Sequence, residues 1–284
     1  MSATTSERAV PACDPLARID LLEATSLAEL TTDAALMTRT DRKYVVPVAA
    51  LPEVVAALQA LDPGLRVLEI DGLRRHRYDS TYLDTPGLEA YWRAARGRRH
   101  RFKVRARHYL DSGAAFTEVK TRGTRGSTVK ARIPRGGSAA AVVPCGLSAE
   151  DDAFVGDELD GAGLAHVDVT ALVPTLRTGY TRTTLWLPTS GARVTIDLDL
   201  VWSLPGGGGT ARVPGLAVVE TKSPGARSGV DRRLWSQGHR PVRISKYGTG
   251  LALLHPDLPA HRWNRVRARH LEPHLTYSQT QEPA

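Results

Sequence analysis

The sequence predicts an α+β protein that is mainly antiparallel β, with helices covering the sheet. Charged and apolar residues alternate along several short stretches, as they do when successive side chains point to opposite faces of a strand. Clusters of proline and glycine bound most of these stretches. Apolar residues at helical spacing occur before and between them, without the regular strand and helix alternation of a parallel α/β fold. We therefore expect one domain built on a single large sheet.

The first part of the chain combines short helices with strands. Residues 1–14 are polar, small and without periodicity, so we expect them to be disordered. The elements expected after them are a short helix over 15–30, a strand over 39–46, an amphipathic helix over 51–61, a strand over 74–84 and a short helix around Leu88, Tyr91 and Trp92.

Three consecutive strands over 101–133 carry the strongest charge pattern. Their charged residues share one parity, which predicts a sheet with an apolar face and a cationic face. Against a single acid, Glu118, this face has eight bases: Arg101, Lys103, Arg105, Arg107, Lys120, Arg122, Lys130 and Arg132. Like charges opposite one another destabilise a sheet, so this face requires either open water or a bound polyanion.

The second half of the chain returns to strands. A loop rich in Pro, Gly and Ala is expected over 134–147, and Ser148 with the acids behind it is a typical helix start. The later elements are strands over 174–188, 192–202 and 216–223, a helix from 229 and a short helix through Leu251 and Leu254. We assign residues 15–256 to one domain and expect the basic tail, 257–284, to be peripheral, either solvated or against a membrane surface.

The overall composition indicates the charge of the binding partner but does not identify the partner. The formal net charge of +8 favours an anionic partner, while aromatic residues make up only 6% and are not interleaved with the bases, which argues against RNA. Neither a signal-type apolar segment nor a run of eighteen apolar residues is present, so we expect a cytoplasmic protein. Cys13 and Cys145 fit neither a disulfide framework nor a metal site.

The charged parity recurs outside the three strands. It includes Lys43, Arg182, Arg193, Asp197, Asp199, Glu220 and Lys222. If the strands close into a barrel with this parity inward, the bases line a cavity and require a highly anionic ligand. The few acids suit a cation that bridges carboxylate and phosphate oxygens. The alternatives are a solvated face, and acids that serve only as ion-pair partners of the bases.

In these segments the chain resembles the vacuolar transporter chaperone (VTC) domain, the polyphosphate polymerase branch of the triphosphate tunnel metalloenzymes. The segments follow the family's order, and no single one is specific. They are RTDRKY (39–44), STYLDT (80–85), KVRARHY (103–109), TEVKTR (117–122), STVKAR (127–132), TGYTRT (178–183), RVTIDLDL (193–200), VVETKS (218–223) and RISKYGTG (243–250).

The resemblance implies a closed eight-stranded β-barrel, the triphosphate tunnel, with helices packed outside. It implies a metal-dependent phosphotransferase that moves the terminal phosphoryl group of ATP onto polyphosphate, with Mn²⁺ or Mg²⁺ as cofactor. The bases expected to be catalytic are Lys43, Arg105, Arg107, Lys120, Lys130, Arg182, Arg193 and Lys246. Further phosphate or substrate contacts are expected from Arg132, Lys222, Arg243, Ser245 and Tyr180. The metal ligands are expected to be Glu220 and, second to it, Glu118.

One departure concerns the superfamily's first strand, where Glu-x-Glu-x-Lys is replaced here by Arg39-Thr40-Asp41-Arg42-Lys43. The loss of one acid favours the polymerase branch over a two-metal hydrolase. The expected partners are ATP and polyphosphate, no nucleic acid, and a membrane protein as the route to any membrane association. A tunnel-type triphosphatase or cyclase stays open as an alternative, as does a non-catalytic module that binds polyphosphate or RNA.

Overall fold

The computed structural model describes residues 14–32, 39–122, 128–136, 147–225 and 228–278. The expectation of disorder for residues 1–14 therefore lies outside the described residues, apart from Asp14. Most of the loop predicted over 134–147 lies outside them as well. Within the described part of the chain, no helix is both long and apolar enough to cross a membrane.

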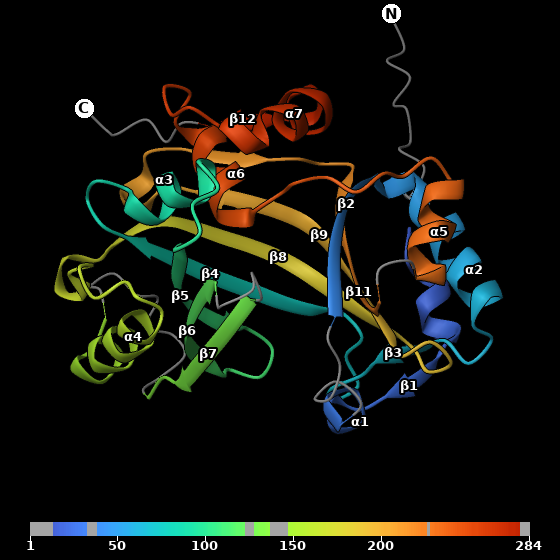
Figure 1. The fold of residues 1–284 in the computed structure, drawn as a ribbon. Coiled ribbons are helices and arrows are strands. Elements are labelled where there is room, and N and C mark those ends of the chain that lie inside the picture. The colour runs from blue at the N-terminus through green and yellow to red at the C-terminus, as the bar shows by residue number, and fades with distance from the viewer. Residues whose placement is uncertain (1–13, 33–38, 123–127, 137–146, 226–227, 279–284) are drawn as a thin grey trace, which may run out of the picture.

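One antiparallel sheet dominates the structure (Figure 1). Eight strands pair in the spatial order β2, β11, β9, β8, β4, β5, β6, β7. Their bounds are β2 (Arg39–Pro47), β4 (His76–Asp84), β5 (Phe102–Tyr109), β6 (Ala115–Arg122), β7 (Thr128–Pro134), β8 (Val173–Leu187), β9 (Ala192–Ser203) and β11 (Leu216–Pro224). The predicted mainly antiparallel α+β class is confirmed.

Four short strands extend this sheet. β1 (Glu23–Thr25) pairs with β3 (Arg66–Leu68), which continues onto β8. β10 (Thr210–Arg212) lies between β9 and β12 (Thr276–Ser278). Among the described residues, no pairing joins β2 to β7, so the pairings themselves give a curved sheet with two ends.

Helices on the outer face cover one half of the sheet. The core there is formed by α2 (Leu51–Leu61), α5 (Gly229–Ser236) and η1 (Ala17–Leu21), packed on the apolar parity of β2, β8, β9 and β11. Val54 and Leu58 of α2 are buried at helical spacing, and Tyr44, Ile196 and Val219 meet them from the strands. Burial of this parity leaves the other, charged parity for the concave face.

Two helices lie against the other half. α3 (Glu89–Ala95) follows β4, and α4 (Ala149–Gly161) packs under β6 and β7 (Figure 1). α4 begins as predicted at Ser148, whose hydroxyl accepts a hydrogen bond from the Asp151 amide. The Asp151 carboxylate in turn accepts one from the Ser148 amide. Short helical turns connect some of these elements: η2 (Val48–Ala50), η4 (Val169–Ala171) and η5 (Pro205–Gly207).

The helix α6 (Lys246–Leu254) lies inside the curve of the sheet, where its buried residues join the larger core. Two of its glycines allow this close approach. A Cβ at Gly250 would stand 2.0 Å from Cδ1 of Trp202, and one at Gly248 would stand 2.1 Å from Trp263. α6 therefore fills one end of the concave side and places its first residue, Lys246, at the charged part.

Two regions differ from expectation. The single helix predicted over 15–30 is instead η1, β1 and α1 (Leu27–Thr32), because Glu23–Thr25 pairs with β3. The segment predicted to be a peripheral tail packs on α6 and places Trp263, Val266 and Leu271 in the core. Its elements are η6 (His261–Trp263), α7 (Asn264–Val266), η7 (Arg267–Leu271) and η8 (Glu272–His274).

Candidate functional site: a basic concave face

Cross-strand pairs place the predicted bases in rows on the concave face. Lys103, Lys120 and Lys130 stand opposite one another on β5, β6 and β7, and Arg105, Glu118 and Arg132 form the next row. Opposed residues of a sheet project to the same side, so the parity predicted for this face is also its observed geometry.

Glu118 gathers three of these bases. Arg105 Nε donates to Glu118 Oε2 at 2.7 Å, Lys130 Nζ lies 2.7 Å from Oε1, and Arg107 Nε lies 3.9 Å from Oε2. Burial would raise the pKa of Glu118, but the three positive charges outweigh it and lower the pKa to about 2. The carboxylate thus stays ionised and fixes the bases in place.

Asp197 forms a second cluster on β9. Arg182 of β8 holds its carboxylate bidentately, with Nε 2.6 Å from Oδ1 and Nη2 2.8 Å from Oδ2, and Lys246 of α6 also pairs with Oδ2. Burial opposes ionisation, yet Arg182 and Lys246 together hold the pKa of Asp197 well below its usual range. Asp197 therefore links the sheet to α6.

Glu220 forms the third cluster, on β11. Lys43 of β2, directly opposite in the register, pairs with Oε2, and Lys222 Nζ lies 2.5 Å from Oε1. Lys222 also reaches Asp41 of β2 at 3.6 Å. Burial acts against the charge, but Lys43 and Lys222 lower the pKa of Glu220 well below its usual value.

Three lysines crowd one another between these clusters. Burial, followed by the charges of Lys120, Arg105 and Lys43, lowers the pKa of Lys103 to about 7. Burial likewise lowers the pKa of Lys43 to about 8, although Glu220 opposes it. Lys120 is reached by solvent, yet the protein around it lowers its pKa too. Lys120 therefore has solvent on one side and charged strands on the other.

Aromatic rings form the wall beside the arginines. Tyr78 and Tyr180 stack at 5.1 Å, and Arg182 lies 5.2 Å from each ring centroid. The Tyr180 hydroxyl is buried and has no hydrogen-bond partner among the described residues. Burial would raise its pKa, but Arg182, Arg107 and Lys246 lower it. The hydroxyl is therefore a buried hydrogen-bonding group that the described part of the chain leaves unsatisfied.

The structure brings most of the predicted site residues together, with a few at the edge. Lys43, Arg105, Arg107, Lys120, Lys130, Arg182, Lys222, Lys246, Tyr180, Glu118 and Glu220 belong to the three clusters and the wall between them. Ser245 caps α6 and accepts from Lys103 Nζ at 2.9 Å. Arg132 is exposed over the Phe116 ring, Arg193 donates to the Leu30 carbonyl oxygen at 2.7 Å, and Arg243 is exposed.

Some residues of the face are missing from the predicted site residues. Lys103 shares the parity of Arg105 and Arg107, so the pattern itself was sufficient to include it among the site residues. Tyr78 and Tyr82 follow the same alternation on β4, but tyrosines in a strand are more typical of the core. Asp199 was grouped with Asp197 by parity, and this was wrong. A register shift in β9 leaves Asp199 exposed with a φ of 53°.

The acids of the concave face can be tested against a divalent metal. Within the described ranges, no group of three or more His, Cys, Asp or Glu residues is arranged so that it could hold a metal ion by itself. Mg²⁺ and Mn²⁺ in phosphate-transfer sites are commonly bound by one or two carboxylates together with substrate phosphate oxygens. Glu220, with Asp41 beyond Lys222, fits that donor set. Glu118 is enclosed by three cations and fits it less well.

The comparison with protein families agrees with this site. The model of the VTC domain matches residues 38–255, which include all eight main strands of the sheet. The chain therefore belongs to the VTC domain family. The curated proteins contain no match to it.

Solved structures with a similar fold are distant. A protein from Bacillus halodurans suggested to be an adenylate cyclase has a TM-score of 0.42 at 10% identity, over 74% of this chain and 94% of that one. A Hippeastrum protein, described as having a dominant triphosphatase activity, has a TM-score of 0.40 at 14% identity. The match covers 79% of this chain and 100% of that one. A hypothetical protein from Pyrococcus furiosus has a TM-score of 0.36 at 10% sequence identity. The match covers 78% of this chain and 96% of that one. The family assignment depends on the VTC match alone.

Proposed function

We propose that the protein is an ATP-dependent polyphosphate polymerase whose basic concave face is the catalytic tunnel. The observation that carries the proposal is the surplus of bases beyond the acids. Glu118, Asp197 and Glu220 each already contact two or more bases, and Lys103 and Lys120 still point into the same space. A chain of phosphates supplies the negative charge that this face lacks.

The proposal includes closure of the sheet into a barrel around the substrate. It is supported by the effect of Glu220 on Lys120, because β6 and β11 are separated in the sheet by β5, β4, β8 and β9. Two side chains so far apart along the sheet interact only if it curls back on itself. β2 and β7 are then the strands that meet.

The reaction is a transfer between phosphates. A terminal oxygen of the acceptor polyphosphate attacks the γ-phosphorus of ATP, a new P–O–P bond forms, the β–γ bridging bond breaks, and ADP leaves with the electron pair. This chemistry needs in-line positioning and neutralisation of charge more than covalent help. Arg105 and Arg182, already oriented by Glu118 and Asp197, present planar donors to phosphate oxygens.

The lysines complete the binding of the charged group. Lys43, Lys103 and Lys120 carry lowered pKa values in the free protein, and an arriving polyanion favours their charged forms. Tyr180 donates its unpartnered hydroxyl to a phosphate oxygen. No protein nucleophile is needed, so trapping of a phosphoenzyme from labelled ATP would contradict this mechanism.

Glu220, assisted by Asp41, would hold the divalent metal, and Glu118 serves to orient the bases. When bound, Mg²⁺ or Mn²⁺ supplies positive charge to the triphosphate oxygens. The remaining steps belong to the side chains named above.

Incubation of the purified protein with ATP and Mn²⁺ or Mg²⁺ tests the proposal. We expect an acid-stable phosphate polymer to form in the wild type and in Arg233→Ala, a variant of an exposed arginine on α5. The polymer should be absent in folded Lys120→Ala and Glu220→Ala. Release of orthophosphate or of a cyclic nucleotide without polymer would instead identify a tunnel triphosphatase or cyclase. Binding of polyphosphate without turnover would identify a binding module.

A further inference from the structure

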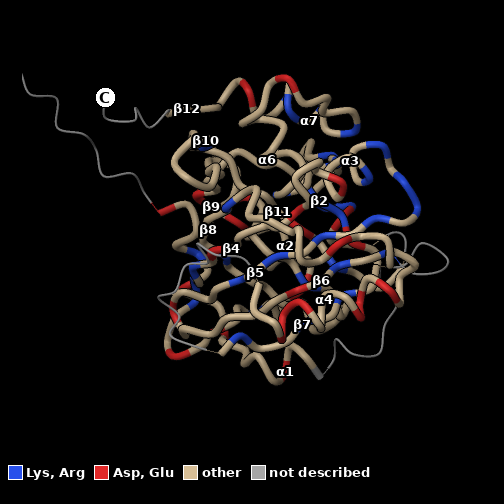
Figure 2. Tube along the Cα trace, turned by 90° about the vertical axis from the view of Figure 1, so that its left-hand side faces the viewer, with Lys and Arg blue, Asp and Glu red and all other residues tan. Residues whose placement is uncertain are grey.

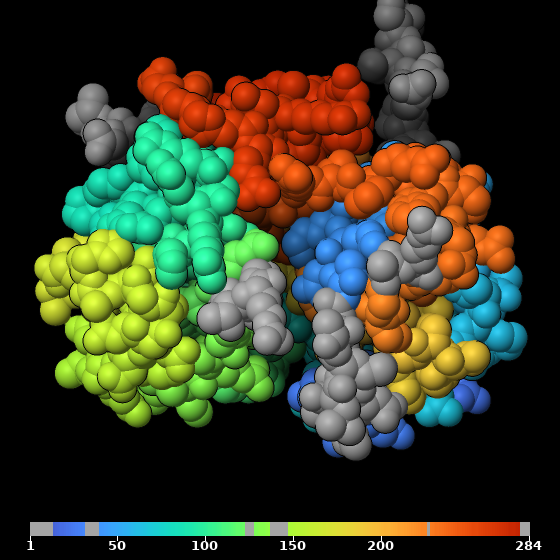
Figure 3. All heavy atoms as spheres, in the orientation of Figure 1, coloured from blue at the N-terminus to red at the C-terminus, as the bar shows by residue number. Residues whose placement is uncertain are grey.

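A pocket of about 480 Å³ connects the concave face to the surface of the molecule. Its lining includes Lys43 and Lys103 from the concave face and Arg101, Arg243 and Arg262 from the surface. We refer to it as the mouth pocket. In Figure 3, the blue atoms of β2 and the turquoise atoms near α3 face each other across a hollow at this place.

The mouth pocket is strongly basic. Asp41 is its single acid, and Lys222 of the concave face already lies 3.6 Å from that carboxylate. Arg262 of η6 reaches across to the next loop, where a Cβ at Gly97 would stand 3.0 Å from its Nη1. Burial lowers the pKa of Arg101, and the positive charges of Arg122 and Arg262 lower it further. These cations repel one another without a ligand between them.

The basic surface continues along the loop over 96–101, which we refer to as the arginine loop. Figure 2 shows this loop as a blue segment that projects from the body after α3. Arg96, Arg98 and Arg99 are exposed on it, and Arg101 donates through Nη1 to the Arg98 carbonyl oxygen at 2.9 Å. The loop thus begins at the mouth pocket and carries its charge outward.

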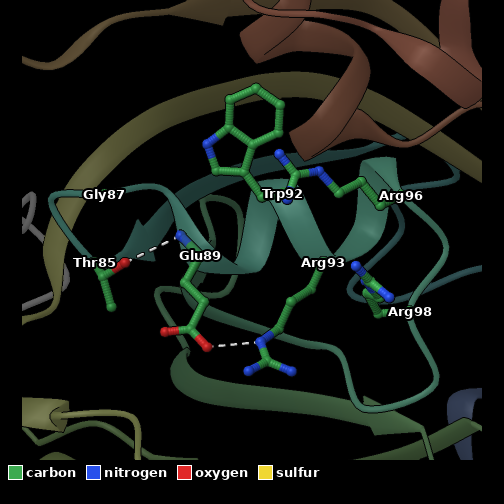
Figure 4. Close-up of a pocket in the computed structure, with 7 residues that line it drawn as sticks. All are labelled: Thr85, Gly87, Glu89, Trp92, Arg93, Arg96 and Arg98. Atoms are coloured by element: carbon green, nitrogen blue, oxygen red, sulfur yellow. Dashed lines mark hydrogen bonds and ion pairs between the residues drawn. The ribbon is translucent and has the colours of Figure 1, made fainter.

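A second pocket is lined by α3 and by the loops on either side of it, including Arg98 of the arginine loop (Figure 4). Its volume is about 650 Å³, and Arg93, Arg96 and Arg98 line it around a single acid, Glu89. Glu89 is already bound by Arg93 at 2.6 Å, and Arg96 lies over the Trp92 ring at 4.8 Å. Two of the three guanidinium groups are therefore held in place, at reduced entropic cost to a ligand.

We propose that the mouth pocket and the arginine loop form an external track that binds the part of a linear polyphosphate chain emerging from the tunnel. The inference deepens the proposed function and rests on it. Lys43 and Lys103 line the same pocket as Arg101 and Arg262, and Arg101 is hydrogen-bonded to the backbone of Arg98, so cations follow one another from the concave face to the loop. A linear chain with a charge on every unit matches such a row, whereas one compact triphosphate occupies only the part inside the tunnel.

Binding of two ready-made phosphates, tripolyphosphate and long-chain polyphosphate, tests the track without any need for turnover. The test variant is Arg98→Glu/Arg99→Glu, at two exposed loop positions. The matched control is Arg212→Glu/Arg233→Glu, which makes the same charge change at exposed positions on β10 and α5. We expect the test variant to weaken long-chain binding roughly tenfold, to flatten its salt dependence and to change tripolyphosphate binding less than about twofold.

Several results would overturn the track. These are equal losses for both phosphates, no loss for either, or an equal long-chain loss in the control variant, which would reduce the effect to net charge. Retention of long-chain binding with loss of binding to phosphatidylserine vesicles would make the loop a membrane contact instead. Failure of the wild type to bind even tripolyphosphate would overturn the proposed function itself. Tripolyphosphate binding with no gain for the longer chain would overturn the track alone.

Discussion

Glu220 on β11 acts electrostatically on Lys120 on β6, although four strands lie between them in the sheet. The interaction crosses the concave face instead of following the sheet. Lys222 and Arg105 act on the same lysine with the opposite sign. Lys120 is thus influenced by charges from strands that lie far apart in the order of the sheet.

Lys120→Gln should separate binding from stability. In the free protein Lys120 is crowded by other cations, so its loss should leave the free energy of unfolding unchanged or slightly raised. A phosphate ligand loses one charged donor, and we expect its affinity to fall roughly tenfold or more. Calorimetric titration with tripolyphosphate and thermal unfolding give the two quantities, with Arg233→Gln as control. A lower melting temperature with unchanged affinity would contradict the assignment of Lys120 to the ligand.

The affinity for tripolyphosphate should fall as the pH rises through about 7 to 8. Lys103 has a pKa of about 7, and Lys43 and Lys130 have pKa values of about 8, all lowered chiefly by burial. The ligand binds the protonated lysines, so binding takes up protons in this range. Titration in buffers of different ionisation enthalpy measures that uptake.

Lys103→Met is the matched variant for this effect. It should remove the step near pH 7 and leave the dependence centred near 8. The stability of the free protein depends on pH in the opposite direction to the affinity. The unfolded chain holds the Lys103 proton up to its ordinary pKa of 10.5, so this lysine makes stability rise with pH between about 7 and 10.5. A pH-independent affinity in the wild type would contradict the role of these lysines.

Glu118→Gln should destabilise the protein at neutral pH by about 3 kcal/mol, because it leaves the buried Arg107 and the half-buried Arg105 without their counter-charge. The carboxylate has a pKa of about 2 against an ordinary 4.5, so its contribution is fully present above 4.5 and disappears as the pH falls through 2. The difference between wild type and variant, measured by urea unfolding, should close over that interval. Asp157→Asn, at an exposed position on α4, is the control. A difference that persists unchanged at pH 2 would rule out this electrostatic origin.

Alternation alone was sufficient to predict the eight main strands and the face that bears the charge, but not the four short strands β1, β3, β10 and β12. A strand has only two faces, so Arg105 and Glu118 share one face as soon as their strands pair in register. The sequence could not show which bases the acids hold. The pairing of Lys246 with Asp197 depends on where α6 packs, and that is set by tertiary contacts distant in the sequence.

Irregular backbone accounts for the other failures. Asp199 leaves the charged face because β9 contains a register shift, and simple alternation does not reveal a shift of this kind. The segment after residue 256 reads as a polar tail, yet Trp263 and Leu271 anchor it to the core. Isolated apolar residues in a basic, proline-containing stretch form no periodic pattern, so their burial is visible only in three dimensions.

Gly250→Ala should damage both the fold and the site, because α6 has no room for a Cβ against Trp202. The added atom would stand 2.0 Å from that buried indole, whose Nε1 donates to the Lys246 carbonyl oxygen at 2.7 Å. Relief of the clash moves α6 away from the sheet and with it the ammonium group that pairs with Asp197. We expect a loss of about 1–3 kcal/mol in the free energy of unfolding, together with weaker phosphate binding.

Gly156→Ala on α4 is the matched control, since a Cβ there meets nothing within 4 Å. In a helix interior this change should leave phosphate binding intact and raise stability by about 0.5–1 kcal/mol. Chemical unfolding and tripolyphosphate titration of both variants make the comparison. If Gly250→Ala were as stable as Gly156→Ala and bound the ligand normally, close packing of α6 on Trp202 would not be what positions Lys246. The link from Trp202 through α6 to Asp197 would then have to be abandoned.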